Sequence, residues 1–294
     1  QGPGCLGAAA ALKNLDTDRP FQIVVYGTPA EETLGSKCDM IKKGCFHDLD
    51  VAFMMHGGPN TCTDVRCLAQ RSFHVTFHGK RAHAALAPDK GRSAFDALLA
   101  AFQGIEFLRE HVPDDVRMHY TVAKLPGPAN VVPAEAEGEF AIRSFSRKTL
   151  EGVCERFLDI IKGASLIAGV DYEIKEGTFF FNKIPVLKLN ELLMNNAKLA
   201  GAPQLAPPRE KTGSTDFGNV MYEIPGSCIR VAFVPEGTPS HSQEFVDAGK
   251  TEAAHNCILY GAKAIAGASM DLIMTDGLMD QVKEEFAENK KKNQ

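Results

Sequence analysis

The sequence predicts an α/β fold, with a mostly parallel sheet covered by helices on both faces and a ferredoxin-like β-α-β-β-α-β domain inserted into it. Near the N-terminus, apolar runs typical of buried strands alternate with helical segments, the pattern of a parallel sheet. From residue 71 the strands alternate polar and apolar residues, as half-exposed strands do. We therefore expect residues 1–69 and 184–294 to form the α/β domain, and residues 70–183 to form the inserted domain.

In the α/β domain, each element is expected from its local pattern. The Ala-rich segment Gly7–Leu15 predicts a helix, and the β-branched and aromatic run Phe21–Tyr26 predicts a buried strand. Lys37–Gly44 is expected to be a short helix that ends at its glycine. The remaining predicted elements are the strand Val51–Met55, the helices Pro185–Ala200 and Asp216–Tyr222, the strand Cys228–Val234 and a long helix from Thr251 onward.

The inserted domain contains two long helical patterns between alternating strands. Four strands and two helices in the order β-α-β-β-α-β form the ferredoxin-like unit. The predicted elements are the strand Arg71–His78, the helix Ser93–His111, the strands Arg117–Leu125 and Ala136–Ser144, the helix Thr149–Ala168 and the strand Val170–Phe181.

Composition excludes some functions. The formal net charge is −5 and no basic patch is present, so we expect no nucleic-acid partner. No apolar run is long enough to suggest a bilayer span, so we expect no membrane association. Eight cysteines without a CxxC pair favour reduced thiols and a cytoplasmic location. A Cys62–Cys67 disulfide is the less favoured alternative.

Two adjacent carboxylates, Glu31 and Glu32, follow the first predicted strand. The carboxyl ends of strands are where open α/β sheets bind ligands. Two neighbouring negative charges repel unless something offsets them, and a metal ion is one such offset. One carboxylate would then bind the ion while the other acts as a general base on a metal-bound water. The alternative is a solvated acidic helix start, which the helix dipole favours.

Two histidines follow later strands of the same predicted sheet. His56 comes directly after Val51–Met55, and His241 lies in the loop after the strand that ends at Val234. Either could instead have a minor role, His56 in capping carbonyl groups and His241 as a solvated loop residue. Together with Glu32 they predict a metal site at one edge of the sheet. Mixed nitrogen and oxygen ligands suit zinc, with manganese and cobalt as alternatives.

Three polar residues of the inserted domain complete the candidate site. His83 follows the first strand of that domain, Asn130 lies in a turn, and Arg143 alternates with apolar residues on a strand. Each residue could instead have a purely structural role. His83 could be an ordinary loop residue, Asn130 could hydrogen-bond to the local backbone of its turn, and Arg143 could form a surface salt bridge. If they face a cleft, they suit an oxyanion and a substrate carboxylate.

Taken together, these motifs resemble a known family along nearly the whole chain. The matching segments are Gly27-Thr-Pro-Ala-Glu-Glu, Met55-His-Gly-Gly-Pro, Gly79-Lys-Arg-Ala-His-Ala-Ala, Asn130-Val-Val-Pro, Ser214-Thr-Asp-Phe and Ser240-His-Ser-Gln-Glu-Phe. The chain resembles the zinc metallopeptidase and amidohydrolase family of aminoacylase, glutamate carboxypeptidase, peptidase T and carnosinase. It is most similar to the branch with aminobenzoyl-glutamate hydrolase, indoleacetyl-amino-acid hydrolase and β-alanyl-lysine dipeptidase.

The resemblance implies a role for each residue of the α/β domain. Glu31 would be the general base, and Glu32, His56 and His241 would be metal ligands. The reaction would be hydrolysis of the amide or peptide bond of an N-acyl-amino acid or dipeptide through a tetrahedral intermediate.

For the inserted domain, the resemblance implies a lid and dimerisation unit. His83 would reach the site of the partner subunit and steady the oxyanion there, while Asn130 and Arg143 would hold the substrate carboxylate. The expected assembly is a homodimer through this domain, acting on small peptides or N-acyl-amino acids.

The start of the chain departs from the family pattern. The first metal motif of the branch reads Cys-Gly-His-Asn, and in this chain Gln1 and Pro3 stand at the positions of the Cys and the His. With no initiator Met and no signal-peptide pattern, the α/β domain is expected to be N-terminally incomplete. Two hypotheses follow: a metal-dependent amidohydrolase, or a non-catalytic relative retained for binding, assembly or a structural role.

Overall fold

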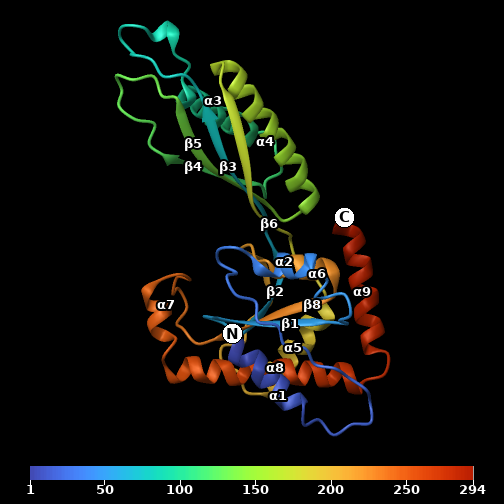
Figure 1. Cartoon of the computed structure of the whole chain (residues 1–294). Helices are drawn as coiled ribbons and strands as arrows, with labels where there is room; N and C mark the ends of the chain where they lie inside the picture. Colours follow the sequence, from blue (N-terminus) through green and yellow to red (C-terminus); the bar gives the residue numbers. More distant parts are fainter. Residues whose placement is uncertain (294) are drawn as a thin grey trace. The chain divides into compact units, whose positions relative to one another are not determined.

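The computed structural model describes residues 1–293, which form two compact units (Figure 1). Unit 1 consists of Gln1–Cys67 and the chain from Lys183 onward, and unit 2 is Leu68–Asn182. The boundaries expected from the sequence, 69/70 and 183/184, lie two residues and one residue from these positions.

The sheet of unit 1 has four strands in the order β1-β8-β2-β7. β1 (Ala52–Gly58) runs parallel to β8 (Gly226–Ala232), and β2 (Cys62–Cys67) runs parallel to β7 (Arg209–Thr212). β2 and β8 are antiparallel. Two of the three strand pairings are therefore parallel, and the sheet is mixed but mostly parallel, as predicted. Neither β2 nor β7 was predicted, because both are short and carry charged residues in place of an apolar pattern.

Helices cover both faces of this sheet, as predicted (Figure 1). On one face lie α1 (Gly2–Leu12), α5 (Leu187–Leu199) and α8 (Glu252–Met274), whose core includes Met55 of β1. On the other face lie α2 (Ser36–Lys42) and α6 (Phe217–Glu223), whose core includes Met54. Successive residues of β1 thus point to opposite faces. α9 (Leu278–Asn293) packs near α5, and the short α7 (Gln243–Ala248) follows the loop of His241.

Among the described helices, α8 is long and apolar enough, by length and composition, to cross a membrane. This corrects the expectation that no segment of the chain reaches that length. Because Cys257, Ala264 and Ile265 are buried in one cluster with residues of the sheet and of α5, the packing of α8 is that of a core helix.

The predicted strand Phe21–Tyr26 was wrong, because the segment has no regular secondary structure. A strand requires a hydrogen-bonded neighbour, and none of the strands within residues 1–293 pairs with it. The large apolar side chains of this segment are 36–42% exposed to solvent, so they are not buried as those of a core strand would be. At its end, Tyr26 packs edge-on against Phe46 and its hydroxyl donates to the carbonyl of Cys45, so the segment is held by side chains.

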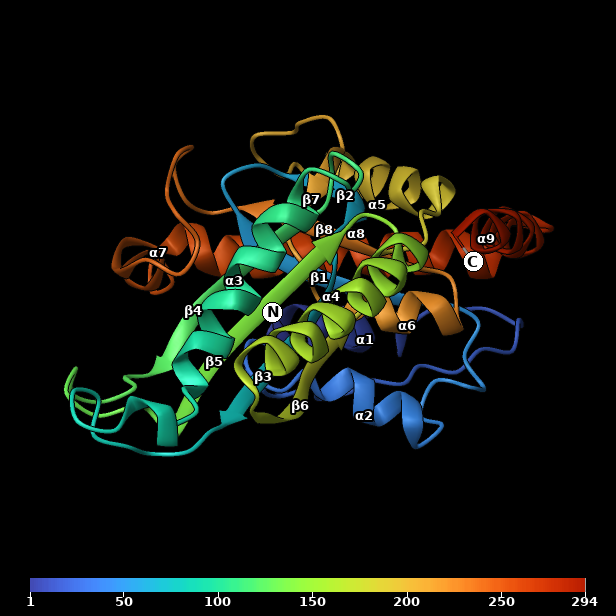
Figure 2. The same ribbon diagram turned by 90° about the horizontal axis from the view of Figure 1, so that it is seen from above.

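Unit 2 has the predicted ferredoxin-like fold. The strands β3 (Ala69–His78), β4 (Arg117–Lys124), β5 (Glu135–Ser144) and β6 (Asp171–Phe180) form an antiparallel sheet in the order β4-β5-β3-β6. α3 (Ala94–Arg109) and α4 (Arg147–Ala168) lie along one face of this sheet (Figure 2), and the short 3₁₀ helix Pro88–Lys90 precedes α3. Phe157 of α4 packs between Phe73 and Phe140, with ring centroids 4.8 and 5.1 Å away.

Gly79, directly after β3, leaves no space for a side chain. A Cβ there would lie 2.1 Å from the carbonyl oxygen of Arg92, which belongs to the backbone. We therefore expect Gly79→Ala to lower the free energy of unfolding by about 1–3 kcal/mol, as overpacking does. The control is Gly163→Ala in α4, where a Cβ meets nothing within 4 Å and should stabilise the helix slightly. Urea unfolding measures the stability of both variants. Equal unfolding midpoints for the two variants would contradict the conclusion that Gly79 leaves no space for a side chain.

Candidate functional site

The two carboxylates lie in the turn that precedes α2. Glu31 is half-buried and Glu32 is exposed, and the turn is closed by hydrogen bonds from the backbone of Leu34 and Gly35 to the carbonyl of Ala30. Ala30 has a φ of 59°, in the left-handed region that non-glycine residues rarely occupy. Strained backbone of this kind occurs preferentially at functional sites.

His241 lies beside Glu32. Its Nε2 is 3.9 Å from an Oε of Glu32, and both side chains are largely exposed, 73% and 67%. His241 also has a positive φ, 63°, and it directly precedes Ser242, whose hydroxyl accepts from the backbone of Phe245 and caps α7. The fold therefore brings the carboxylate and the imidazole together from distant parts of the chain.

His56 lies within β1 rather than after it, which corrects the predicted strand end. Its Nδ1 is 2.6 Å from the carbonyl oxygen of Gly57, so Nδ1 donates and Nε2 remains free to accept. Burial lowers the pKa of His56, and the nearby charge of Arg230 lowers it further. The neutral imidazole, which is the ligating form, is thereby favoured.

The donor types of this region suit a divalent cation, since they are a carboxylate and two imidazoles. However, within residues 1–293 no group of three His, Cys, Asp or Glu side chains is arranged to hold a metal ion. Glu32 and His241 are adjacent, while His56 is not in a common ligand set with them. The fit to a metal ion is therefore partial.

A buried ion pair, which was not predicted from the sequence, anchors the chain directly after the acidic turn. The Nζ and the backbone N–H of Lys37 donate to the carboxylate of Asp216 at 2.7 and 3.1 Å. Both side chains are buried, with 8% and 0% exposure. The pair joins α2 to the start of α6, so the position of the segment that carries Glu31 and Glu32 depends on it. Asp216 belongs to the Ser214-Thr-Asp-Phe motif, which was the available signal.

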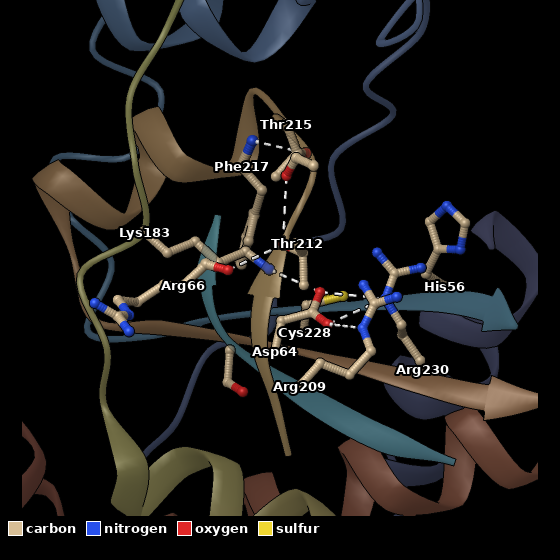
Figure 3. A network of polar contacts seen from close by, with 12 residues as sticks. His56, Asp64, Arg66, Lys183, Arg209, Thr212, Thr215, Phe217, Cys228 and Arg230 are labelled. Carbon is tan, nitrogen blue, oxygen red and sulfur yellow. Dashed lines mark hydrogen bonds and ion pairs between the residues drawn. The ribbon is translucent and has the colours of Figure 1, made fainter. Parts of the chain in front are cut away.

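A second buried carboxylate, Asp64 on β2, binds three cations (Figure 3). Lys183 donates to Oδ2 at 3.0 Å, while the Nε atoms of Arg209 and Arg230 donate to Oδ1 at 2.8 and 3.1 Å. Burial alone would raise the pKa of Asp64, but Lys183, Arg230 and Arg209 together hold it well below its ordinary value. No local pattern in the sequence joins residues so far apart, so the network was not predicted.

Strand register places this network in line with His56. Arg230 is opposite His56 in the β1–β8 pairing and opposite Cys62 in the β8–β2 pairing, and Asp64 is opposite Arg209. Residues opposite one another in neighbouring strands share a face of the sheet. The row from His56 to Arg209 thus lies on one face, the face that α2 and α6 cover in part.

In unit 2, two of the three predicted residues lie together. His83 and Val131 form an isolated bridge, and the backbone of Ala84 donates to the carbonyl of Asn130 at 3.0 Å. The Nδ1 of His83 accepts from the backbone of Ala85 and Leu86, both at 3.3 Å, so its proton is on Nε2.

Arg143 lies elsewhere in unit 2, near the far end of β5 from the turn of Asn130. At the usual rise of a strand, eight residues from Glu135 to Arg143 span about 27 Å. One copy of unit 2 therefore does not place Arg143 beside His83 and Asn130, so the condition that the three face one cleft is not met within a single unit 2. The Nε of Arg143 is buried without a hydrogen-bond partner within the described part of the chain.

Comparison with known proteins extends along most of the chain. Residues 70–166 match the peptidase dimerisation domain family. The chain is 30% identical over 285 residues to Xaa-Arg dipeptidase of Mus musculus, covering 96% of this chain and 66% of that protein. It is 27% identical over 322 residues to a p-aminobenzoyl-glutamate hydrolase chain of Escherichia coli (strain K12), covering 88% and 66%. The chain thus spans just under two thirds of the length of these relatives.

Solved structures share the fold. A dinuclear metal-binding peptidase of the M20 family from Bacillus subtilis superposes with a TM-score of 0.65 at 18% identity, covering 92% of this chain and 71% of that one. The aminobenzoyl-glutamate utilization protein of Klebsiella pneumoniae gives a TM-score of 0.57 at 21% identity, covering 78% and 57%.

The Lys37–Asp216 pair is expected to contribute strongly to stability. Asp216→Ala leaves the ammonium of Lys37 buried and unpaired, which should cost about 3–5 kcal/mol of unfolding free energy. The control, Lys42→Ala, breaks an exposed pair with Asp39 on the same helix and should change little. Urea unfolding of both variants tests this, and a small loss in Asp216→Ala would show that the pair does not anchor the turn.

Asp64 should make stability depend on acid pH. In the unfolded chain its carboxyl binds a proton near a pKa of about 3.9, whereas in the folded protein the three cations keep it ionised to lower pH. The unfolded state then binds more protons, so stability falls as the pH drops below about 4. The decrease between pH 5 and 3 should be smaller in Asp64→Asn and unchanged in Asp159→Asn, an exposed control, as measured by chemical denaturation. Equal decreases in all three proteins would exclude the effect.

Proposed function

The chain belongs to the M20 family of peptidases and amidohydrolases, and on this premise we propose that it is a metal-dependent hydrolase of amide or peptide bonds. The substrates in this proposal are N-acyl-amino acids or dipeptides, because the relatives include a dipeptidase and an aminobenzoyl-glutamate hydrolase. The observation that carries the proposal is the juxtaposition of Glu32 and His241 beside Glu31, in a strained turn next to the sheet.

In the proposed mechanism, Glu31 takes a proton from the attacking water and later delivers it to the leaving amine. Its half-buried position in the turn before α2 leaves it able to reach a substrate. Glu32 and His241, which lie together, would hold the divalent ion, zinc in our proposal with manganese or cobalt as alternatives, and His56 would be a third ligand only if it joined their ligand set. That ion, when bound, supplies Lewis-acid activation of the substrate carbonyl and of water.

His83 is suited to stabilise the oxyanion of the tetrahedral intermediate. Because the backbone of Ala85 and Leu86 occupies Nδ1, the exposed Nε2–H is available as a donor. A positioned donor of this kind stabilises charge that develops in the transition state. In the same proposal, Asn130 and Arg143 hold the carboxylate of the amino acid.

The separation of Arg143 from His83 and Asn130 favours a site shared between two subunits. We include a homodimer through unit 2 in the proposal, in which one subunit supplies His83 and its partner supplies Arg143. β4 and β6 are the edge strands of the unit 2 sheet, and either can pair across a two-fold axis.

All eight cysteines are free thiols, which fits a cytoplasmic protein and does not bear out the Cys62–Cys67 alternative.

A second candidate is a non-catalytic relative that keeps the fold for binding or assembly. It is favoured by the lack, within the described residues, of three side chains arranged around a metal ion. Elemental analysis of the purified protein, combined with hydrolysis assays on N-acyl-amino acids and β-alanyl dipeptides, separates the candidates. Metal near stoichiometry with metal-dependent turnover supports the hydrolase, whereas neither after zinc or manganese is added supports the non-catalytic relative.

For the base, we expect Glu31→Gln to reduce turnover by at least about a hundredfold while the metal content stays unchanged, because the amide cannot accept the proton. Glu191→Gln, an exposed change on α5, serves as the control and should keep full activity. Turnover and metal content are measured on the same preparations. Undiminished turnover in Glu31→Gln would rule out its role as the base.

A further inference from the structure

The Asp64 network carries more positive charge than it needs for its own neutrality. One carboxylate faces three cations, Lys183, Arg209 and Arg230, so the group has a net charge of +2. The thiols of Cys62 and Cys228 add no negative charge, since burial raises the pKa of both. Partly buried cations without counter-charge are costly, so an anion would be bound favourably here.

The two arginines are held in a way that leaves their outer ends free. Each guanidinium uses its Nε to bind Asp64, and neither has another hydrogen bond or ion pair within residues 1–293. Because both Nε atoms contact the same Oδ1, at 2.8 and 3.1 Å, they are within about 6 Å of each other. The Nη groups are therefore fixed, close together and available as donors.

Both arginine side chains are partly exposed to solvent. The side chain of Arg209 is 39% exposed and that of Arg230 is 19% exposed, whereas the side chain of Lys183 is buried, with 2% exposure. The buried lysine and carboxylate thus form the base of the group, and the guanidinium groups form its accessible side. Figure 3 shows them on the side of Asp64 toward His56.

The position relative to His56 indicates what the anion belongs to. Arg230 is directly opposite His56 in the strand register, and its charge acts on the imidazole. An anion on the two guanidinium groups would lie beside a proposed metal ligand, on unit 1. In the proposed function the amino-acid carboxylate is assigned to Asn130 and Arg143 of unit 2, so we assign the anion on unit 1 to a second acidic group of the substrate.

We propose that Arg209 and Arg230 form a carboxylate-binding subsite that recognises an acidic acyl group of the substrate. Planar carboxylates match the fork of a guanidinium and form paired, charge-assisted hydrogen bonds with it. The assignment of the bound anion to the acyl group of a substrate rests on the proposed hydrolase function. The existence of an anion site rests only on the geometry of the Asp64 network.

A binding experiment tests the site without any requirement for activity. Metal-free protein, kept in chelator and low chloride, is titrated calorimetrically with glutarate, acetate and inorganic phosphate. We expect saturable glutarate binding that Arg209→Gln weakens at least about tenfold, through loss of a charge-assisted contact. Arg209 is on the edge strand and partly exposed, so this variant should fold, as circular dichroism will verify. Lys198→Gln, which removes an exposed positive charge elsewhere in unit 1, should bind as the wild type does.

The outcomes separate the alternatives. No carboxylate binding, or binding that Arg209→Gln leaves unchanged, would show that the arginines only cross-link β2, β7 and β8 and would overturn the proposal. Tighter binding of phosphate than of either carboxylate would overturn the carboxylate assignment.

A second assay relates the site to substrate choice. N-glutaryl- and N-pentanoyl-amino acids differ by one carboxylate in the acyl group, and we expect a preference for the glutaryl substrate that Arg209→Gln removes. If neither substrate is hydrolysed, the hydrolase function fails while the binding result still stands. If both are hydrolysed with equal kcat/KM in the wild type, the acyl-group assignment is overturned.

Discussion

The carboxylate of Asp64 is the constraint on which the arrangement of unit 1 depends. Its partners come from β7, from β8 and from Lys183, the residue at which the chain returns from unit 2. β2 itself ends at Cys67, where the chain leaves unit 1. The exit and the return of the inserted unit are therefore tied by one buried ion pair at 3.0 Å. A buried carboxylate with a single cation would barely offset its desolvation, whereas three cations fix the strands in one register.

The turn that carries Glu31 and Glu32 depends on a second buried ion pair on the same face of the sheet. Lys37 and Asp216 join α2 to α6, and the turn with Glu31 and Glu32 precedes α2 directly. The preceding segment, Phe21–Tyr26, belongs to none of the strands within residues 1–293 and is held by side-chain contacts such as that of Tyr26 with Phe46. The turn is thus rigidly held on its carboxyl-terminal side and weakly held on the other. Its conformation, with a positive φ at Ala30, relies on the anchored side.

The three candidate residues of unit 2 lie toward opposite ends of its strand β5. Its sheet buries one face under α3 and α4, around Phe157, while His83 and Asn130 lie in a loop and Arg143 alternates with the buried residues Phe140 and Ile142 along β5. The loop of His83 and Asn130 lies beyond one end of β5, and Arg143 lies near the other end. Because a ten-residue strand is rigid, a single subunit cannot bring these groups together. This rigidity is the physical basis for the shared site in the proposal.

By itself, the sequence determined the fold class, nearly every helix and strand with a clear period, and the candidate residues Glu31, Glu32, His56, His83, Asn130, Arg143 and His241. It could do so because apolar periodicity and the motifs are local signals. The tertiary structure alone decided which of these residues meet: Glu32 meets His241, and His83 lies near Asn130, but Arg143 lies far from both. It also decided that Phe21–Tyr26 is not a strand, since strand formation requires a partner that no local pattern specifies. The Asp64 network had no local signal in the sequence, and the Asp216 pair was signalled only by the Ser214-Thr-Asp-Phe motif, because burial and long-range pairing, not residue type, determine what a charged side chain does.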